Sequence, residues 1–233
     1  MKKIFLIILL LSEFLLGANK ILYTMDFTKQ KDGDAKEWLK TQGFKFLMDM
    51  KDLSLKFEDG ALVIETKGKQ AGVMGIEFLK EKHLHNISHA KIEWGVERFP
   101  KGAHWDEGNN RVAIGIFFAF GEKKFRSGIP LVGKKVPYFL APFIGEHESQ
   151  DKMYLGALYK KNGRYYCVSN TANKNIKTLF KIDEIFQEEF NKQTPALSAF
   201  AIQMNTKDTN NGAKAFIKKI TFYSKNNTQS QGF

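Results

Sequence analysis

The sequence predicts an all-β protein, an antiparallel two-sheet β-sandwich of the jelly-roll type with one or two short helices. About a dozen short segments alternate apolar and polar residues with period two, and turn residues separate them. No strand–helix–strand rhythm, internal repeat or inter-domain linker interrupts this series. We therefore expect one sandwich domain over residues 19–225 of the 233-residue chain, followed by a disordered tail over 226–233.

The clearest predicted strands are residues 92–99 and 112–120. The second places five large apolar side chains on one face and mostly small ones on the other, a pattern that indicates a central strand. Residues 100–111 between them are too polar for the core and too long for a tight hairpin. Because loops on a rigid sheet concentrate binding groups, this loop is the first candidate site.

Shorter strands are predicted on both sides of this pair. They cover residues 20–27, 44–48, 53–57, 61–66 and 72–78, then 137–144, 153–159, 164–169, 197–204 and 215–223. Asp59-Gly60 and Asn162-Gly163 predict hairpin turns. Residues 182–190 have helical spacing and predict one short amphipathic helix, and Trp38 lies in a predicted helical turn. Residues 121–136 predict an ordered loop.

The N-terminus has the features of a secretory signal peptide. A basic start at Lys2 and Lys3 precedes a short apolar run, and small residues end at Ala18, where we place the cleavage site. The alternative is an uncleaved anchor, but the run is shorter than the roughly 20 residues that span a bilayer. We expect an exported protein, periplasmic or extracellular, with no transmembrane segment in the mature chain. Cys167 is the single cysteine, so no internal disulfide is expected.

The net charge is +11, and removing residues 1–18, with two lysines and one glutamate, leaves +10. A basic exported protein attracts acidic polysaccharide, lipid phosphate or nucleic acid, although a solvated lysine-rich surface explains the same charge. The export signal and the absence of a nucleic-acid motif argue against nucleic acid. The segment 121–136 has the densest positive charge of the mature chain.

Within the loop 100–111, Trp105 is the candidate platform for stacking on a sugar ring. The predicted ligand-binding residues are His104, Trp105, Asp106, Glu107 and Asn109, with Lys123, Lys124 and Arg126 supplying positive charge. The alternative is that Trp105 folds back and plugs the core.

Metal binding is a secondary hypothesis, and no cofactor is expected. The segment 205–212 is rich in oxygen side chains, and Asn205, Asp208 and Asn210 are weak candidates for Ca²⁺. His83 and His85 are two residues apart and would share a face on a strand, but neutral surface histidines are the more common reading.

Several segments resemble known families. Phe27, Trp38 and the run 59–64 resemble the opening of lectin-like and carbohydrate-binding jelly rolls. Residues 92–96 with the following loop and strand, residues 182–190 and residues 201–209 resemble an uncharacterised family of exported bacterial proteins, domain of unknown function 3047. The resemblance implies export and a sandwich fold, and it implies no established activity. The family tends to carry paired Asp where Asn109 and Asn110 stand here.

Three functions remain open at this point. The first is a non-catalytic protein that binds a glycan or another anionic cell-envelope component. The second is a glycoside hydrolase or lyase that uses Glu93 and Glu97, although Gly95 replaces the middle acid of the laminarinase-type strand that this segment resembles. The third is a structural envelope protein with a protein partner. The sequence does not indicate the oligomeric state.

Overall fold

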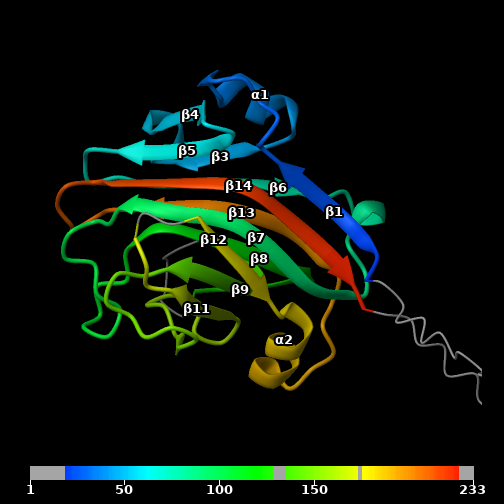
Figure 1. Ribbon diagram of the computed structural model, residues 1–233. Coiled ribbons are helices and arrows are strands. Elements are labelled where there is room, and N and C mark those ends of the chain that lie inside the picture. Colours follow the sequence, from blue (N-terminus) through cyan, green and yellow to red (C-terminus); the bar gives the residue numbers. More distant parts are fainter. Residues whose placement is uncertain (1–18, 128–134, 173–174, 226–233) are drawn as a thin grey trace, which may run out of the picture.

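The computed structural model describes residues 19–127, 135–172 and 175–225, which form two sheets packed face to face (Figure 1). Sheet A has the order β12 (Ile176–Phe180), β7 (Ile87–Arg98), β14 (Ala213–Ser224), β5 (Ala61–Thr66), β4 (Ser54–Glu58) and β2 (Gly33–Asp34), and β1 (Ile21–Asp26) also pairs with β14. Sheet B has the order β10 (Met153–Tyr154), β11 (Gly163–Ser169), β9 (Val136–Ile144), β8 (Val112–Phe125), β13 (Leu197–Asn205), β6 (Ala71–Glu77) and β3 (Lys45–Met48).

The predicted β-sandwich is confirmed. From β5 to β8, and again from β11 to β14, the chain alternates between the two sheets, as expected for a jelly roll. One pairing differs from the all-antiparallel prediction, because β9 and β11 are parallel. The chain reverses after β9 to form β10 at the edge of the sheet, and it reverses again to return as β11 between β10 and β9. Because of the two reversals, β11 runs in the same direction as β9.

The core lies between the sheets and follows the alternation of the sequence. On β8, Ile114, Ile116, Phe118 and Phe120 are at most 1% exposed, and β8 is central in sheet B, as predicted. Trp94 of β7 is fully buried opposite them, and its indole Nε1 donates a hydrogen bond to Thr178 Oγ1 over 3.0 Å. A buried indole nitrogen needs such a partner, so this bond lets the largest core side chain remain inside.

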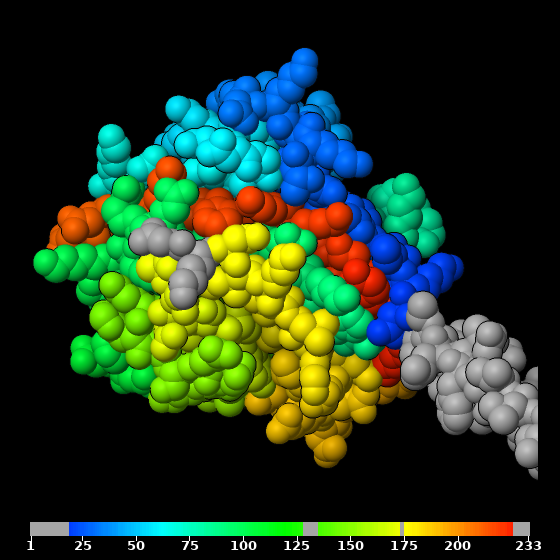
Figure 2. Space-filling view, in the orientation of Figure 1, coloured from blue at the N-terminus to red at the C-terminus, as the bar shows by residue number. Residues whose placement is uncertain are grey.

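Helix α2 (Ile182–Phe190) has the predicted bounds and closes one end of the sandwich beside β12 (Figures 1 and 2). Ile182 and Phe186 bury its apolar face, and the helix ends where Asn191 takes a left-handed conformation. Helix α1 (Lys36–Thr41) is the predicted turn that carries Trp38, which packs on the rings of Phe27 and Phe57. Two 3₁₀ turns, Asp49–Asp52 and Lys80–Lys82, complete the helical structure of the described residues.

The two predicted hairpin turns have different outcomes. Asp59 and Gly60 both have positive φ and join β4 to β5, as predicted. The antiparallel pair expected around Asn162-Gly163 is present as β10 and β11, but the predicted tight turn is wrong, because β10 ends at Tyr154 and eight residues separate it from β11. The Asn162 side chain is buried and donates to the carbonyls of Val136 and Pro137, so it fixes the loop to β9 instead of forming a two-residue turn.

Two further boundaries correct the sequence prediction. β8 continues to Phe125, so Lys123 and Lys124 lie on a strand and not in a loop. β7 begins at Ile87, which leaves His83 and His85 outside any strand.

The predicted signal peptide and tail lie outside the described residues. Within the described ranges, no helix is long and apolar enough to cross a membrane. The single-domain boundary stays a prediction, and limited proteolysis that gives two stable halves would contradict it.

Candidate functional site

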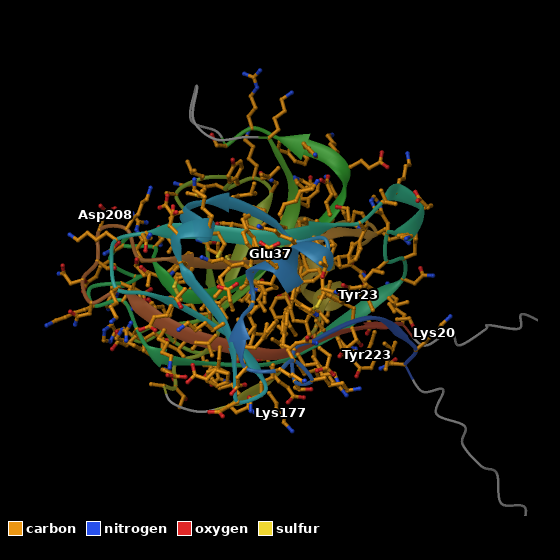
Figure 3. The ribbon with its side chains drawn as sticks, turned by 90° about the horizontal axis from the view of Figure 1, so that it is seen from above. Lys20, Tyr23, Glu37, Lys177, Asp208 and Tyr223 are labelled. Carbon is orange, nitrogen blue, oxygen red and sulfur yellow. The ribbon has the colours of Figure 1, made fainter. Side chains whose placement is uncertain are left out.

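The loop 100–111, called here the Trp105 loop, lies at one end of the sandwich and is tied to two other segments. Arg111 donates to the Lys207 carbonyl and forms an ion pair with Asp208 at 2.6 Å. Lys101 pairs through its backbone with Asn210. Asp208 marks this end in Figure 3, opposite Lys20 and Tyr223. The loop is therefore anchored on both flanks.

Trp105 is a buried plug and not an exposed platform. It is 6% exposed and stacks on Phe143, with ring centroids 4.6 Å apart, while the rings of Tyr154 and Tyr165 contact it from the sides. Its Nε1 donates to the Arg111 carbonyl over 3.1 Å. Because both the indole face and its donor are occupied, the prediction that Trp105 stacks on a sugar does not fit this geometry, and the alternative of a plug does.

The plug covers the outer face of sheet B, not the space between the sheets. Phe143 of β9 and Tyr165 and Cys167 of β11 lie on that outer face. With Trp105, Val112 and Tyr154 they form a second apolar cluster, separate from the main core. Tyr154 and Tyr165 are therefore used for packing in this cluster. Burial also raises the pKa of the Cys167 thiol to about 11, as expected for an inert buried cysteine.

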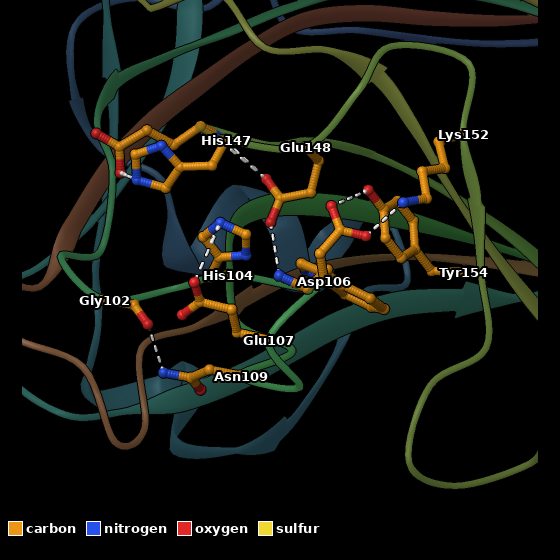
Figure 4. A network of polar contacts seen from close by, with 11 residues as sticks. Gly102, His104, Asp106, Glu107, Asn109, His147, Glu148, Lys152 and Tyr154 are labelled. Atoms are coloured by element: carbon orange, nitrogen blue, oxygen red, sulfur yellow. Dashed lines mark hydrogen bonds and ion pairs between the residues drawn. The ribbon is translucent and has the colours of Figure 1, made fainter.

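A buried glutamate holds the Trp105 loop in place (Figure 4). Glu148 is 2% exposed, and its carboxylate accepts hydrogen bonds from the backbone N–H of Trp105 at 2.8 Å, Glu146 at 3.0 Å and His147 at 3.2 Å. A Cβ at Gly145 would overlap Glu148 Oε2, so a larger residue there would displace the carboxylate around which the turn folds. No sequence pattern points to Glu148, because its partner Trp105 becomes a neighbour only in the fold.

Asp106 is also committed to partners within the protein. It forms an ion pair with Lys152 and accepts a hydrogen bond from the Tyr154 hydroxyl at 3.2 Å. The hydrogen bond from Lys152 is the main reason that the pKa of Asp106 lies below its usual value. Burial, and then the charge of Asp106, raises the pKa of Tyr154. Asp106 is thus the anionic partner of a lysine and a tyrosine.

His104, Glu107 and Asn109 make short-range contacts in and beside the loop. The His104 ring stacks on His147 with centroids 5.3 Å apart, and its Nε2 lies 3.8 Å from a Glu107 oxygen. Asn109 donates to the Gly102 carbonyl and closes the loop on itself. The structure therefore brings His104, Asp106, Glu107 and Asn109 into one network (Figure 4), but most of its donors and acceptors serve the loop.

The positive charge predicted to serve this loop lies elsewhere. The loop precedes the first residue of β8, whereas Lys123 and Lys124 are close to its last residue. Lys123 lies eleven positions after Val112, which corresponds to roughly 35 Å at the rise of a β-strand. Arg126 follows directly after β8. The prediction of one site made by the loop and these cations is wrong, because they occupy opposite ends of one strand.

The candidate calcium residues already have partners. Asn205 Oδ1 accepts a hydrogen bond from the Lys207 N–H at 3.2 Å, and Asp208 is paired with Arg111, which lowers its pKa. Asn210 is held through its backbone to Lys101. Among the described residues, no group of three or more His, Cys, Asp or Glu is arranged to hold a metal ion.

Glu93 and Glu97 lie on the outer face of sheet A. Glu97 forms an ion pair with Lys214 at 2.7 Å, which raises the pKa of that lysine. Glu93 stands in register between Lys177 of β12 and Lys219 of β14. Glu97 is thus paired with a lysine of the neighbouring strand, whereas Glu93 has lysines as register neighbours and Lys219 forms its own ion pair with Asp26. A retaining glycosidase instead needs two carboxyl groups about 5–5.5 Å apart.

The outer face of sheet B contains an open groove of about 550 Å³ away from the Trp105 loop, called here the sheet B groove. Its lining comes from β3, β6, the turn 78–83, β8, β9 and β13, and comprises Lys45, Glu77, Phe78, Leu79, Lys80, His83, Ala119, Gly121, Glu122, Lys124, Pro137, Ser198 and Ala199.

Strand register explains why the groove is hollow. Glu77 of β6, Ala199 of β13 and Ala119 of β8 are direct neighbours across three adjacent strands. Side chains at these positions point away from the core, and two of the three are methyl groups. Gly75 continues the small surface on β6, where an added Cβ would lie 2.7 Å from that of Ala201. The floor is thus close to the backbone, with longer charged side chains around it.

Charged side chains surround this floor. Lys80 forms an ion pair with Glu122 at 3.0 Å, and its hydrogen bond lowers the pKa of Glu122. Glu77 lies 4.0 Å from both Lys45 and Lys124. Of the predicted ligand-binding residues, Lys124 is the one that lines the groove. The small face of residues 113–119 was visible in the sequence, but its neighbours on β6 and β13 were not.

No protein-family model matches the chain, so the resemblance to domain of unknown function 3047 has no support from a family match. No curated protein matches either.

Three solved structures are similar. A low-affinity xylan-binding module, CBM86, from Roseburia intestinalis has a TM-score of 0.34 and 10% identity over 77% of this chain and 93% of that one. The agarase AgWH50C has a TM-score of 0.35 and 8% identity over 87% of this chain. PfGH50B has a TM-score of 0.33 and 11% identity over 79% of this chain. This chain spans about a quarter of the last two, at 24% and 23%. Scores at this level support no inference about ligand or activity.

Proposed function

We propose that this chain is a non-catalytic protein that binds a glycan chain in the sheet B groove. The observation that supports this proposal is the row formed by Glu77, Ala199 and Ala119. It gives an open groove of about 550 Å³ with a methyl-lined floor and charged edges. Sugar rings present flat C–H faces and a rim of hydroxyls, so they suit a shallow apolar floor bordered by hydrogen-bonding groups.

The proposal moves the site away from the Trp105 loop but keeps the predicted class of ligand. Trp105 packs on Phe143 with its faces covered, whereas the groove is open. The net charge of +11 favours acidic partners over basic ones. We include export to the periplasm or cell surface in the proposal because of residues 1–18. Mass spectrometry of the exported protein should find Asn19 at its N-terminus, and an intact Met1 in a membrane fraction would contradict export with cleavage.

A glycan array followed by titration calorimetry tests the groove directly. Ala199→Leu places a larger side chain on the floor and should abolish binding to any array hit. Gln203→Leu is the matched control, because it lies on the same face of the same strand outside the groove and should leave binding unchanged. Equal binding by both variants would remove the groove as the site. Release of reducing sugar from a hit would contradict the non-catalytic part of the proposal.

A further inference from the structure

The charged edge of the sheet B groove contains one carboxylate shared between two lysines. Glu77 Oε2 lies 4.0 Å from Lys45 Nζ, and Glu77 Oε1 lies 4.0 Å from Lys124 Nζ. Lys45 comes from β3, Glu77 from β6 and Lys124 from β8, so three strands supply the three charges. The side chains are 73%, 62% and 52% exposed, respectively. This arrangement is called here the Lys–Glu–Lys triad.

The triad has unused binding capacity. Charge-assisted hydrogen bonds from an ammonium to a carboxylate are about 2.7–2.9 Å long, and both distances to Glu77 exceed this. Each ammonium has three donors, and neither lysine side chain donates a hydrogen bond within the described ranges. By contrast, the nearby pair of Lys80 and Glu122 is closed at 3.0 Å. Two cations therefore share one acid, with a net positive charge left at the groove.

Glu77 also shows which chemical group fits between the lysines. Its carboxylate lies between the two ammonium groups, so a planar anion of that size can approach both from the open side. We propose that Lys45 and Lys124 bind the carboxylate of a hexuronic acid, and that the ligand of the groove is an acidic polysaccharide. This inference rests on the proposed function and specifies its substrate class. In this arrangement Glu77 competes with the ligand for the two ammonium groups.

Calorimetry with oligogalacturonate and the same oligomer fully methyl-esterified tests the inference, because the two probes differ in charge but share a backbone. The native protein should bind the acidic form about three- to tenfold more tightly, the range expected for two exposed ion pairs. Added salt should reduce this preference, since exposed charges are screened within about 8–10 Å.

Three variants separate the triad from general charge. Lys124→Ala should remove most of the preference for the acidic form. Lys123→Ala is the matched control, because the neighbouring side chain on β8 points to the other side of the strand and does not line the groove. Glu77→Gln should strengthen binding of the acidic oligomer and leave the esterified one unchanged. This gain of affinity is an effect that damage to the fold would not produce.

The outcomes distinguish this inference from the proposed function. Equal affinity for the acidic and esterified oligomers, or weaker acidic binding by Glu77→Gln, would overturn the assignment to acidic polysaccharide while leaving a glycan site in the groove. Equal losses in Lys123→Ala and Lys124→Ala would also overturn it, since they would indicate general electrostatic attraction. If no glycan on an array binds the native protein, the proposed function fails and this inference fails with it.

Discussion

Replacing Trp105 by alanine should destabilise the protein strongly without abolishing binding in the sheet B groove. An aromatic side chain buries about 150–250 Å², which at about 25 cal/mol per Å² gives roughly 4–6 kcal/mol as an upper estimate. Measured Trp→Ala truncations in cores cost about 3–5 kcal/mol. Because Trp105 is 6% exposed and packed on Phe143, Tyr154 and Tyr165, we expect the same 3–5 kcal/mol loss in the free energy of unfolding.

Urea denaturation followed by fluorescence and a calorimetric melting curve measure this loss. For a chain of this size each kcal/mol shifts Tm by about 2–4 °C, so Trp105→Ala should melt roughly 6–20 °C lower. Trp105→Phe is the matched control. It keeps a ring against Phe143 and loses the hydrogen bond from Nε1 to the Arg111 carbonyl, so it should cost about 1–2 kcal/mol. A melting temperature within a degree of native for Trp105→Ala, with binding lost, would show that Trp105 belongs to a ligand site.

Three other predictions follow from buried polar groups. Glu148→Ala leaves three backbone N–H groups without their acceptor and should cost about 1–3 kcal/mol, measured by urea midpoint, with Glu148→Gln costing less. Cys167, with its pKa raised to about 11, should not react with Ellman's reagent at pH 8 until the protein unfolds, and rapid labelling of the native protein would refute its burial. Burial, and then the charge of Lys91, lowers the pKa of His89, so the folded state binds fewer protons than the unfolded state. Stability should fall as pH drops below about 6.5, and His89→Gln should lose less stability than native between pH 7.5 and 5.5. An identical pH dependence in the two proteins would contradict this.

Much of the fold could be predicted because its signals are local. The alternation in residues 112–120 indicates both a strand and its buried face, and Ile114, Ile116 and Phe118 are fully buried as expected. The spacing in residues 182–190 gives the bounds of α2 without error. In both cases the pattern that predicts the element lies entirely within that element, so no contact with a distant segment is needed to recognise it. The end of β8 was missed because Lys123 and Lys124 are polar residues on an exposed extension, where no alternation marks the strand.

The candidate sites are formed by contacts between segments that are distant in the sequence, and local sequence patterns do not predict such contacts. Trp105 lies in a polar loop, and that local composition suggested an exposed indole. Its partners Phe143, Tyr154 and Tyr165 come from β9, β10 and β11, and β11 reaches its place through a parallel pairing that no local signal predicts. Likewise, Ala119 and Ala199 form a floor because β8 and β13 are paired in one register, while each alanine alone is unremarkable.

The outer face of sheet B has one half that a loop covers and one half that is open, and the size of the outward side chains accounts for the difference. Over β9 and β11 large aromatic side chains project outward, and the Trp105 loop covers them with an aromatic side chain of its own. At the groove end of β8, β13 and β6 the outward residues Ala119, Ala199, Ala201 and Gly75 are small, so no large aromatic side chain there needs a loop to cover it. Phe117 lies at the boundary and contacts the rings of Phe139 and Tyr165. The Trp105 loop would therefore block a polymer sterically on the covered half, and the polymer would lie along the open half. This places the Lys–Glu–Lys triad, and not the Trp105 loop, beside its path.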